Sequence, residues 1–390
     1  MKILIVSQVF DDGYIRGAER VAMNVAMRLS DRNEVEILSL GDESGQDWVV
    51  GLPVKRLRFD FAPRPSAHSL KLGACGKMAW HLRNAWGGVS QDALGACLDA
   101  ATPDVIYAHK ATAFMPQLFK ACADRGLPLV LHLHDYSTLC PRTTMFKSDH
   151  NCATACFSCR AFTASWRRHS RAVTDVIAVS AFVENRHRRQ GAFPNARWHV
   201  VHNTDSSDLE GFVRKSSEGK FTFGFIGAVT PQKGFDDLIA AFAALPEDTS
   251  ARLVVAGTGA EDYVFSSKEK LSGRHVEWLG HVNPNDFYSR VDCVIVPSRW
   301  HEPQALVISE ALRRGLPVIA SNRGGNSEVL GPRSGHMLYN PDTSGDLLAA
   351  LIEMQNTRPE VPIEALNPEF YMMVEEILTL AAVKGGNSDG

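Results

Sequence analysis

The sequence of 390 residues predicts an α/β protein with two doubly wound, Rossmann-like domains. Short apolar runs alternate with segments whose apolar residues recur at helical spacing, a pattern typical of parallel sheets covered on both faces. The length is sufficient for two domains, each with its own core. A polar stretch at residues 204–220 separates two halves of the same type.

The first half contains six apolar runs that we expect to be strands. They lie at residues 2–6, 35–38, 105–109, 129–134, 176–179 and 200–202. Between the first two, the segment AERVAMNVAMRLS carries apolar residues at helical spacing. These elements define an expected N-terminal domain at residues 1–205, on the acceptor side of the site inferred below.

The second half contains five more expected strands, at residues 221–226, 252–256, 275–279, 293–296 and 316–320. We place a linker at 206–220 and a C-terminal domain at 221–365. Residues 366–390 are expected to form a last helix, around 368–383, that crosses back to the N-terminal domain and ends in a disordered tail. Ligands of such sheets bind outside the carboxyl ends of the strands, so we expect a site in a cleft where the two domains face each other.

Composition narrows the class of protein. A net charge of −3 gives no reason to expect nucleic acid as a partner. The N-terminal run MKILIVSQVF is too short for a secretory signal, and no segment approaches the ~18 apolar residues of a membrane span. We therefore expect a cytoplasmic protein whose eight cysteines are reduced thiols or metal ligands.

The segment WHEPQALVISEALRRG places Glu302 and Glu310 eight residues apart across the start of an expected helix. Pro303 suits its first position and Gly315 the left-handed residue after its last turn, which gives a separation of roughly 12 Å. Free amides at a helix start attract phosphate, and a nucleotide diphospho-sugar carries diols at both ends of its phosphates. An exposed terminal Glu and a solvated mid-helix Glu are the alternative interpretation.

The residues around this helix add a more specific pattern. Pro297-Ser298 ends a strand before the paired glutamates, and the next strand is followed by Gly324-Gly325 and Glu328. The unit resembles the donor site of the family-4 retaining glycosyltransferases, which have the GT-B fold. The resemblance implies that Glu302 holds the sugar hydroxyls and Glu310 the ribose. Further donor-site residues are Ala305 and Leu306.

A candidate cation follows the first strand of the second half, in GFIGAVTPQKGF. Lys233 there can meet a pyrophosphate as it departs, whereas a lysine on a surface loop is the alternative. The relatives carry Gly-Arg followed by Lys-Gly, and this chain keeps Gly227, Lys233 and Gly234 but has Ala228 in place of the arginine. Either the donor is held less tightly or another cation substitutes. The candidates are Arg299 and Arg323.

Two further glycine-containing loops are candidates for contact with the donor nucleotide. Gly257-x-Gly259 is a weak dinucleotide signal because the third glycine is missing, and the resemblance places this loop beside the nucleotide. In DDGYIRGAERV, which is similar to the family's Gly-Gly-Ala-Glu-Arg segment, Gly17 would let the backbone approach the donor phosphates and Gly13 would free the loop. A plain turn before a helix is the alternative.

Histidines follow two of the expected strands, at His109 and His134, while His132 is expected to face a core. A lone histidine is more often structural than catalytic. His134-Asp135 nevertheless resembles the family's His-Asp, which reaches the donor sugar. We therefore take His134 as the sugar contact and His109 as a weaker candidate.

Four cysteines, Cys140, Cys152, Cys156 and Cys159, lie within twenty residues. In a cytoplasmic protein this spacing favours a structural zinc over disulfides, with packed reduced thiols as the alternative. A subset of the resembled family carries a similar cluster.

Arginines then crowd near Phe162, Trp166 and Phe182, which suggests a patch for anionic lipid and peripheral membrane contact. A solvated charged face is the alternative.

These features predict a retaining glycosyltransferase that moves a hexosyl unit from a nucleoside-diphosphate sugar to an acceptor hydroxyl. The catalytic residues are expected to be His134, Glu302 and Lys233, without a catalytic metal because no Asp-x-Asp element stands at the cleft. A glycan or polyprenyl-diphosphate-linked acceptor in bacterial surface polysaccharide or glycolipid assembly is inferred by analogy. The alternatives are a glycosidase, a non-catalytic nucleotide-sugar-binding protein, and a nucleotide-sugar epimerase of the same architecture.

Overall fold

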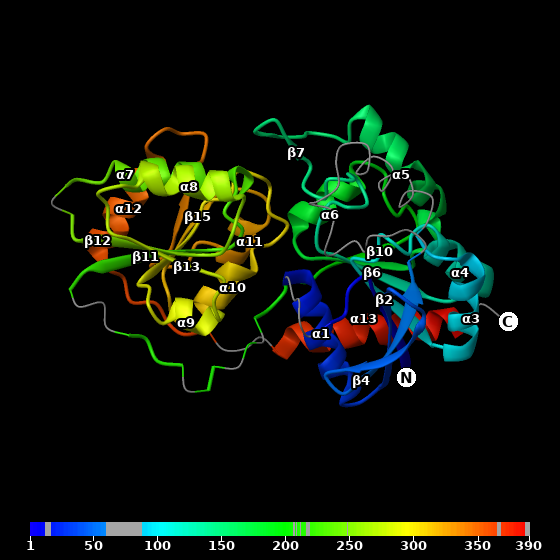
Figure 1. Ribbon diagram of the computed structural model, residues 1–390. Helices are drawn as coiled ribbons and strands as arrows, with labels where there is room; N and C mark the ends of the chain where they lie inside the picture. Colours follow the sequence, from blue (N-terminus) through cyan, green and yellow to red (C-terminus); the bar gives the residue numbers. More distant parts are fainter. Residues whose placement is uncertain are drawn as a thin grey trace. The chain divides into compact units, whose positions relative to one another are not determined.

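The structure is a computed structural model. It describes residues 1–11, 17–59, 88–205, 207, 209–210, 212–215, 219–247, 249–364 and 368–386 (Figure 1). The contacts within the chain divide it into two compact units. Unit 1 comprises Met1–Met145, Cys152–His202 and Pro368–Gly390, and unit 2 comprises Phe146–Asn151 and Asn203–Asn367. The main boundary thus falls after residue 202, slightly before the expected end of the first domain at residue 205.

Unit 1 is built on a sheet of eight strands in the order β10-β9-β6-β5-β1-β2-β4-β3, in which only β3 runs antiparallel to its neighbour. The bounds are β1 Lys2–Ser7, β2 Glu34–Gly41, β3 Gly45–Val49, β4 Leu52–Arg58, β5 Val105–His109, β6 Leu129–Leu133, β9 Asp175–Ala178 and β10 Arg197–Val200. The strand predicted at 200–202 was wrong, because the strand there ends at Val200. β3 and β4 were not predicted, because polar residues interrupt their apolar ones.

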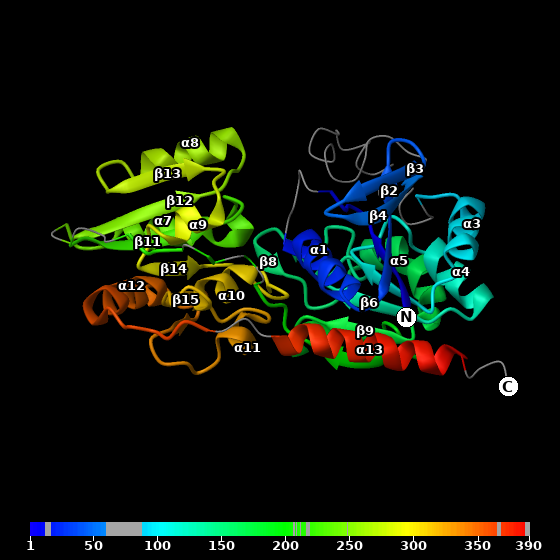
Figure 2. The same cartoon turned by 90° about the horizontal axis from the view of Figure 1, so that it is seen from below.

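The helices of unit 1 are α1 Gly17–Ser30, α3 Gln91–Ala101, α4 Gln117–Arg125, α5 Phe157–His169, α6 Ala181–Arg188 and α13 Pro368–Gly386. The last of these contacts α1, β5 and β6, and α1 and α13 can be followed in Figure 2. Val374 and Leu378 of α13 are fully buried, so an apolar stripe attaches this helix to unit 1. The chain therefore returns to its first unit. The predicted disordered end, 387–390, lies outside the described residues.

Unit 2 contains a parallel sheet of six strands in the order β13-β12-β11-β14-β15-β16. They are β11 Phe221–Ile226, β12 Ala251–Ala256, β13 Val276–Gly280, β14 Cys293–Val296, β15 Val318–Ser321 and β16 Met337–Tyr339. The helices are α7 Phe235–Ala243, α8 Glu261–Lys270, α9 Pro284–Tyr288, α10 Leu306–Leu312, α11 Asn326–Leu330 and α12 Asp346–Thr357. All five predicted strands of this half are present. A short hairpin, β7 Phe146–Lys147 with β8 His150–Asn151, also belongs to unit 2 and was not predicted.

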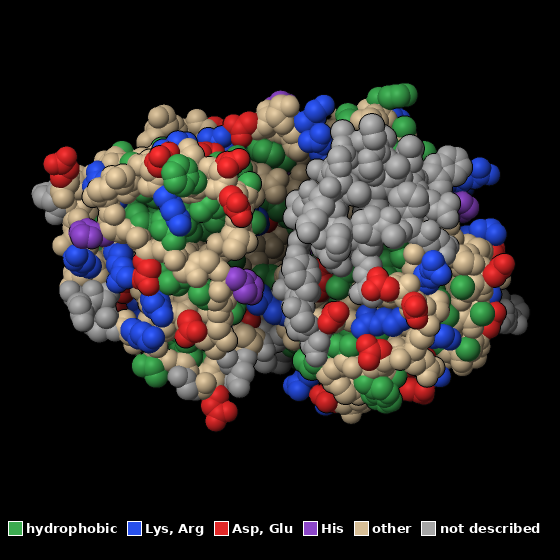
Figure 3. Space-filling view, viewed as in Figure 1, with side chains coloured by type: hydrophobic (Ala, Val, Ile, Leu, Met, Phe, Trp, Pro, Cys, Tyr) green, Lys and Arg blue, Asp and Glu red, His purple; other side chains and the backbone are tan. Residues whose placement is uncertain are grey.

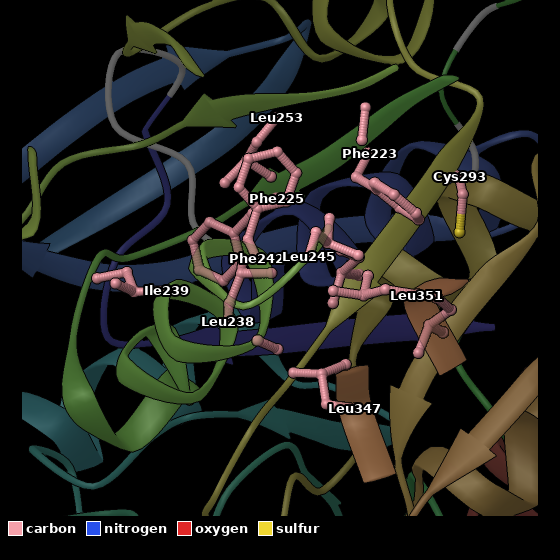
Figure 4. Packing of buried hydrophobic residues seen from close by; sticks show 14 of the residues in the cluster. Phe223, Phe225, Leu238, Ile239, Phe242, Leu245, Leu253, Cys293, Leu347 and Leu351 are labelled. Atoms are coloured by element: carbon pink, nitrogen blue, oxygen red, sulfur yellow. The ribbon is translucent and has the colours of Figure 1, made fainter. Parts of the chain in front are cut away.

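The core of unit 2 follows from the alternation of side chains along its strands. Phe223 and Phe225 point to one face of the sheet, where they meet Leu238 and Phe242 of α7 and Leu351 of α12 (Figure 4). On the neighbouring strands, Val254 and Val294 point to the other face of the sheet, where they pack against α9 and α10. Burying one such phenylalanine contributes about 1.5–3 kcal/mol, so the pattern itself fixes the layering.

The segment between the two expected domains is bonded to unit 2 at several points. Asn203 exchanges two hydrogen bonds of 2.7 Å with the side chain of Gln304. The carboxylate of Asp205 accepts from Nη1 of Arg314 at 2.9 Å, and the amide of Lys215 donates to the carbonyl oxygen of Ser289 at 2.7 Å. The described part of this segment is therefore part of the second unit.

The surface carries charges of both signs. On the face drawn in Figure 3, acidic and basic side chains of the described residues are interspersed, which fits the net charge of −3. No helix in the described part of the chain combines the length and apolar composition needed to cross a bilayer.

Candidate active site

The candidate site of unit 2 lies where the strand order of its sheet reverses. β11 is flanked by β12 on one side and β14 on the other, and β14 leads on to β15 and β16. Phe223 pairs with Cys293 and Gly224 with Val294, so the two strands run side by side to the same edge. Loops that leave this edge diverge to opposite faces of the sheet, and ligands of doubly wound sheets bind between them.

The structure brings together Lys233, which follows β11, and Glu302, which follows β14. Nζ of Lys233 lies 2.5 Å from Oε1 of Glu302, and Oγ of Ser298 donates to the same oxygen at 2.7 Å. Glu302 is only 3% exposed, which excludes the exposed terminal glutamate of the alternative interpretation. Oε2 of Glu302 has no hydrogen-bond partner among the described residues. This oxygen is therefore available to accept a hydrogen bond from a ligand hydroxyl.

Two glycines of the sequence pattern hold these loops against each other. Gly234 has φ +72°, and a Cβ atom there would lie 1.7 Å from the carbonyl oxygen of Pro297. Gly324 has φ +61°, and its Cβ would lie 2.0 Å from the carbonyl oxygen of Glu302. The amide of Gly325 also donates to that oxygen, at 2.7 Å. Any side chain at these two glycines would displace the Lys233 or Glu302 loop.

The helix after Glu302 starts later than predicted. Helix α10 begins at Leu306 with Ala305 as its N-cap, so the placement of Pro303 at the first helical position was wrong. The carbonyl oxygen of Glu302 accepts from the amide of Gly325 in the neighbouring loop, and the first helical residue is Leu306. The separation of 12 Å, which assumed a continuous helix, no longer applies. Gly315 does adopt the left-handed conformation, with φ +61°.

Glu310 is fixed inside the unit. It is 4% exposed, which excludes a solvated mid-helix glutamate, and its Oε2 accepts a hydrogen bond from the hydroxyl of Tyr288. The guanidinium of Arg314 lies 4.6 Å from the centre of the Tyr288 ring. Arg314 is in turn held by Asp205 at 2.9 Å and by Asn285 at 2.7 Å. The orientation of Glu310 thus depends on a buried polar network that the sequence pattern did not reveal.

The two arginines proposed to replace the missing one at position 228 both have acidic partners. Ala228 is exposed in the loop after β11. Arg299 forms two bonds to the carboxylate of Asp237, at 2.6 and 2.5 Å, and one to Asp149 at 2.5 Å. Arg323 is paired with Asp342. Both guanidinium groups are therefore held by carboxylates, as the ammonium group of Lys233 is by Glu302.

The Gly257-x-Gly259 loop serves close packing between backbones. A Cβ atom at Gly257 would lie 1.8 Å from the carbonyl oxygen of Gly227, and one at Gly259 would lie 2.2 Å from that of Val229. The two glycines thus let the loop after β12 lie directly against the loop after β11. This contact accounts for both glycines without a dinucleotide.

In unit 1, three histidines gather at the carboxyl ends of β5 and β6. Nδ1 of His109 lies 2.9 Å from Nε2 of His134, and Nδ1 of His132 lies 2.7 Å from the hydroxyl of Tyr107. His109 and His132 are fully buried, whereas His134 is half-buried. The structure thus leaves His134 accessible and places His109 behind it, as a hydrogen-bond partner of His134.

All three imidazoles are neutral at neutral pH. Burial lowers the pKa of His134 to about 3, and the positive charge of Lys110 adds to this effect. Burial also holds the pKa values of His109 and His132 well below the usual range. His134 can therefore donate or accept a hydrogen bond without carrying charge.

One ring nitrogen of each of these histidines lies within 4.8 Å of the others, a spacing that a metal ion could bridge. The rings of His132 and His134 are stacked, with centroids 4.1 Å apart and planes 28° apart. The lone pairs of stacked imidazoles lie in nearly parallel planes and do not converge on one point. The geometry therefore fits hydrogen-bonded neutral rings better than a metal cage.

An ion pair beside these histidines was missed in the sequence. Nζ of Lys110, the residue after His109, lies 2.9 Å from Oε1 of Glu19 on helix α1. Gly17 is the first residue of that helix, and Gly13 lies outside the described residues. The strand order of unit 1 reverses between β1 and β5, so this group occupies the ligand-binding edge of the first sheet as well. The sequence did contain a signal for this ion pair, because Glu19 is the glutamate of the Gly-Ala-Glu-Arg segment.

Family comparisons agree with both halves of this architecture. Residues 16–204 match the family described as "Glycosyl transferase 4-like domain". Residues 207–361 match the family described as "Glycosyl transferases group 1". The chain carries a glycosyltransferase 4-like domain followed by a group 1 glycosyltransferase domain. Its two domains have the α/β architecture of the GT-B glycosyltransferases, as predicted.

Individual relatives of this glycosyltransferase are distant. It is 21% identical over 332 residues to an uncharacterized 42.6 kDa protein in the cps region of Klebsiella pneumoniae, a match that covers 84% of this chain and 87% of the relative. An uncharacterized glycosyltransferase of Methanocaldococcus jannaschii is 39% identical over 111 residues, 27% of this chain and 28% of the relative. The crystal structure of Anabaena HepE in complex with UDP and glucose aligns with a TM-score of 0.66 at 20% identity, over 97% of this chain and 99% of that chain.

The cysteine cluster of the glycosyltransferase is only partly assembled. The sulfur atoms of Cys140 and Cys159 lie 3.5 Å apart, close to the ~3.8 Å expected of two thiolates on tetrahedral zinc. Cys156 is exposed and its sulfur lies 3.2 Å from the hydroxyl of Ser158, which contributes most to lowering its pKa to about 7. Within the described chain, no three cysteines have all their sulfurs within 4.8 Å of one another. The geometry fits zinc at the first pair and does not form a four-cysteine cage.

The predicted lipid-facing patch of the glycosyltransferase differs from expectation in its aromatic residues. Trp166 is buried and Phe162 and Phe182 are half-buried, so these rings are not presented to a membrane. Phe157, at the start of α5, is instead 89% exposed, and Arg160 on the same helix is also exposed. An exposed apolar ring beside a basic side chain therefore exists, at a different position of the same segment.

Proposed function

We propose that the protein is a retaining glycosyltransferase that transfers a hexosyl unit from a nucleoside-diphosphate sugar to an acceptor hydroxyl. The observation that carries the proposal is the contact of 2.5 Å between Lys233 and Glu302 at the switch point of the second sheet. It sets a cation and an anchored carboxylate side by side where phosphate and sugar of a donor would meet. Such preorganised charge is the usual main source of catalysis in group transfer.

Each polar residue then has a chemical task. Oε2 of Glu302 accepts from a sugar hydroxyl, and Glu310 accepts from the ribose. Lys233 and the backbone around Gly227, Ala305 and Leu306 stabilise the diphosphate as it departs. His134 contributes a neutral imidazole to the sugar. No protein residue becomes covalently attached.

The reaction exchanges one bond for another at the anomeric carbon. The bond from this carbon to the diphosphate oxygen breaks, and the acceptor oxygen bonds to the same face of the carbon. The proton of the acceptor hydroxyl passes to the departing phosphate oxygen. Because Lys233 touches Glu302, the growing negative charge on the phosphate can draw Lys233 toward it as the bond lengthens.

The comparisons support the substrate class at a coarser level. The similar structure of HepE contains UDP and glucose, which favours testing uridine donors first. A relative encoded in a cps region favours surface polysaccharide assembly as the setting. An acceptor that is a glycan or a polyprenyl-diphosphate-linked saccharide is part of the proposal.

A thermal-shift screen of nucleotide sugars, followed by transfer and donor-hydrolysis assays, tests the proposal. A donor at 100 times its dissociation constant stabilises the folded state by about 2.7 kcal/mol. We expect Glu310→Gln to raise the donor's KM and Lys233→Ala mainly to lower kcat. Glu353→Gln and Lys120→Ala, both at exposed positions, are the matched controls. Wild-type rates in both test variants would contradict the assignment.

The same assays separate the alternatives. Cleavage of a glycoside without any nucleotide donor would indicate a glycosidase. A product that stays linked to the nucleotide would indicate an epimerase, and donor binding without transfer or hydrolysis would indicate a binding protein. For a transferase, the anomeric configuration of the product decides between retention and inversion.

Membrane contact is a separate proposal, supported by the exposed Phe157 beside Arg160. Partition of an apolar ring and attraction of a basic residue to anionic lipid act together in interfacial binding. We expect sedimentation with phosphatidylglycerol vesicles to fall in Phe157→Ser, while the matched change at exposed Phe265 has no effect. Binding that is insensitive to lipid charge and to Phe157→Ser would reject the proposal.

A structural zinc at Cys140, Cys152, Cys156 and Cys159 is likewise proposed, and the 3.5 Å approach of Cys140 and Cys159 is its support. Thiolate zinc sites stabilise a fold and have no open position for chemistry. Metal analysis after anaerobic purification should give one zinc per chain, and Cys140→Ser with Cys159→Ser should abolish it. A stoichiometry near zero in the wild type would end the proposal.

A further inference from the structure

The short hairpin β7–β8 is an unexpected part of the second unit. The chain leaves unit 1 after Met145, forms this hairpin over residues Phe146–Asn151, and returns to unit 1 at Cys152. The two turn residues, Ser148 and Asp149, have φ of 50° and 61°. Two central residues with positive φ are typical of the tight turns that match the twist of paired strands. The hairpin is thus a locally well-defined element, although each of its strands has only two residues.

The hairpin binds the segment directly before Glu302. Nδ2 of Asn151 donates to the carbonyl oxygen of Arg299 at 2.9 Å, and Oδ1 of Asn151 accepts from the amide of His301 at 2.8 Å. A single side-chain amide thereby satisfies one acceptor and one donor of the backbone, as a neighbouring strand would. It fixes the path of the chain on both sides of Trp300, which is buried.

The same segment is tied to the loop that carries Lys233. The amides of Arg299 and Trp300 both donate to the carbonyl oxygen of Gln232, at 3.1 and 3.3 Å. Asn151 therefore holds one side of a short stretch of chain whose other side is bonded to the residue before Lys233. Movement of this stretch would change the contact of 2.5 Å between Lys233 and Glu302.

Asp149 contributes less than Asn151 to holding the segment before Glu302 in place. Its ion pair with Arg299 is at 2.5 Å, but the Asp149 side chain is 57% exposed. Exposed ion pairs contribute little because water and salt screen them. Arg299 is in any case held by its two bonds to Asp237.

We propose that Asn151 is a positioning residue for Glu302, which acts through the backbone of Arg299 and His301. This inference rests on the proposed function for the identity of the ligand, and it assigns to the hairpin a role in recognising the sugar part of the donor. Glu302 is the sugar-binding carboxylate, so an error in its position affects the sugar more than the nucleotide.

The test compares two ligands and one backbone amide in the full-length chain. Calorimetry measures binding of UDP-glucose and of UDP, or of the donor found in the screen and its nucleotide, to the wild type and to Asn151→Ala. We expect the sugar nucleotide to bind about 10- to 100-fold more weakly in the variant, because small misplacements at a reacting centre carry effects of this order. UDP itself should change less than threefold. Asn195→Ala, which removes an exposed side-chain amide in unit 1, is the matched control and should change neither.

Hydrogen exchange of the peptide containing His301, measured without ligand, provides a readout independent of function. Asn151→Ala should speed exchange of the His301 amide by at least tenfold, while Asn151→Asp, which keeps the acceptor, should retain most of the protection. Unchanged exchange in Asn151→Ala, or equal weakening of UDP and UDP-glucose, would overturn the inference. If the wild type binds no nucleotide sugar, the proposed function fails, and the exchange experiment still decides whether Asn151 positions the loop.

Discussion

The buried histidines of unit 1 predict that the protein loses stability as the pH falls below about 6.5. An unfolded histidine takes up a proton near pH 6.5, whereas His134 in the folded protein does so only near pH 3. The folded state therefore binds fewer protons in this window. Because stability rises with pH wherever the unfolded state binds more protons, the contribution of His134 is present above pH 6.5 and is lost on acidification.

The magnitude follows from the pKa difference. Each pH unit between these two pKa values changes the free energy of unfolding by about 1.4 kcal/mol per histidine, so His134 alone accounts for roughly 2 kcal/mol between pH 6.5 and pH 5. The burial of His109 and His132 adds to this effect in the same direction. For a protein of ordinary stability, this is a large fraction of the free energy of unfolding, lost between pH 6.5 and pH 5.

Urea unfolding followed by circular dichroism at pH 7, 6 and 5 measures the effect. The free energy of unfolding of the wild type should fall relative to that of His134→Gln by roughly 2 kcal/mol between pH 7 and pH 5. His281→Gln, at an exposed position, serves as the control and should follow the wild type. Equal pH dependence in the wild type and His134→Gln would refute the lowered pKa of His134.

Three further predictions concern particular contacts. Gly324→Ala should abolish detectable donor binding in calorimetry, because its Cβ would lie 2.0 Å from the carbonyl oxygen of Glu302; a donor affinity equal to the wild type would show that the loop can shift freely. Arg314→Met should destabilise the protein by about 1–3 kcal/mol in urea unfolding, because the buried carboxylate of Asp205 then keeps only Ser207 and the more distant Arg313, at 3.5 Å, as partners among the described residues; an unchanged free energy of unfolding would contradict this. In protein freed of metal by a chelator, Cys156 should react with iodoacetamide faster than the other described cysteines, with a midpoint near pH 7 in mass-spectrometric labelling, and a midpoint above pH 8.5 would exclude its lowered pKa.

Much of the fold was accessible from the sequence because the strands of parallel sheets are short, apolar and separated by amphipathic helices. Strands were missed where the pattern of apolar and polar residues does not indicate which side chains are buried. The strands Gly45–Val49 and Leu52–Arg58 lie at one edge of the first sheet, where polar residues are tolerated. The hairpin Phe146–Asn151 is stabilised by contacts with residues about 150 positions away, which no local pattern reveals.

The candidate site shows the same division. The residue types and spacing of Lys233, Glu302 and Glu310 were visible in the sequence, and so was the resemblance that connects them. The start of α10 at Leu306 was not, because the backbone of Glu302 is bonded to Gly325, in a loop that comes only after the next strand. The partners of Arg299 were also hidden, since its charge is visible in the sequence and its neutralisation by Asp237 is not.

The sequence by itself determined the two parallel sheets, the loops that leave them, and the kinds of side chain at their carboxyl ends, because periodicity and glycine placement act over short distances along the chain. Only the tertiary structure decided which of those side chains touch. Three contacts join residues far apart in sequence. They are the 2.5 Å contact of Lys233 with Glu302, the hydrogen bond between His109 and His134, and the hydrogen bond of Asn151 to the amide of His301. Such contacts are set by how whole strands and loops pack, and packing depends on the complete fold.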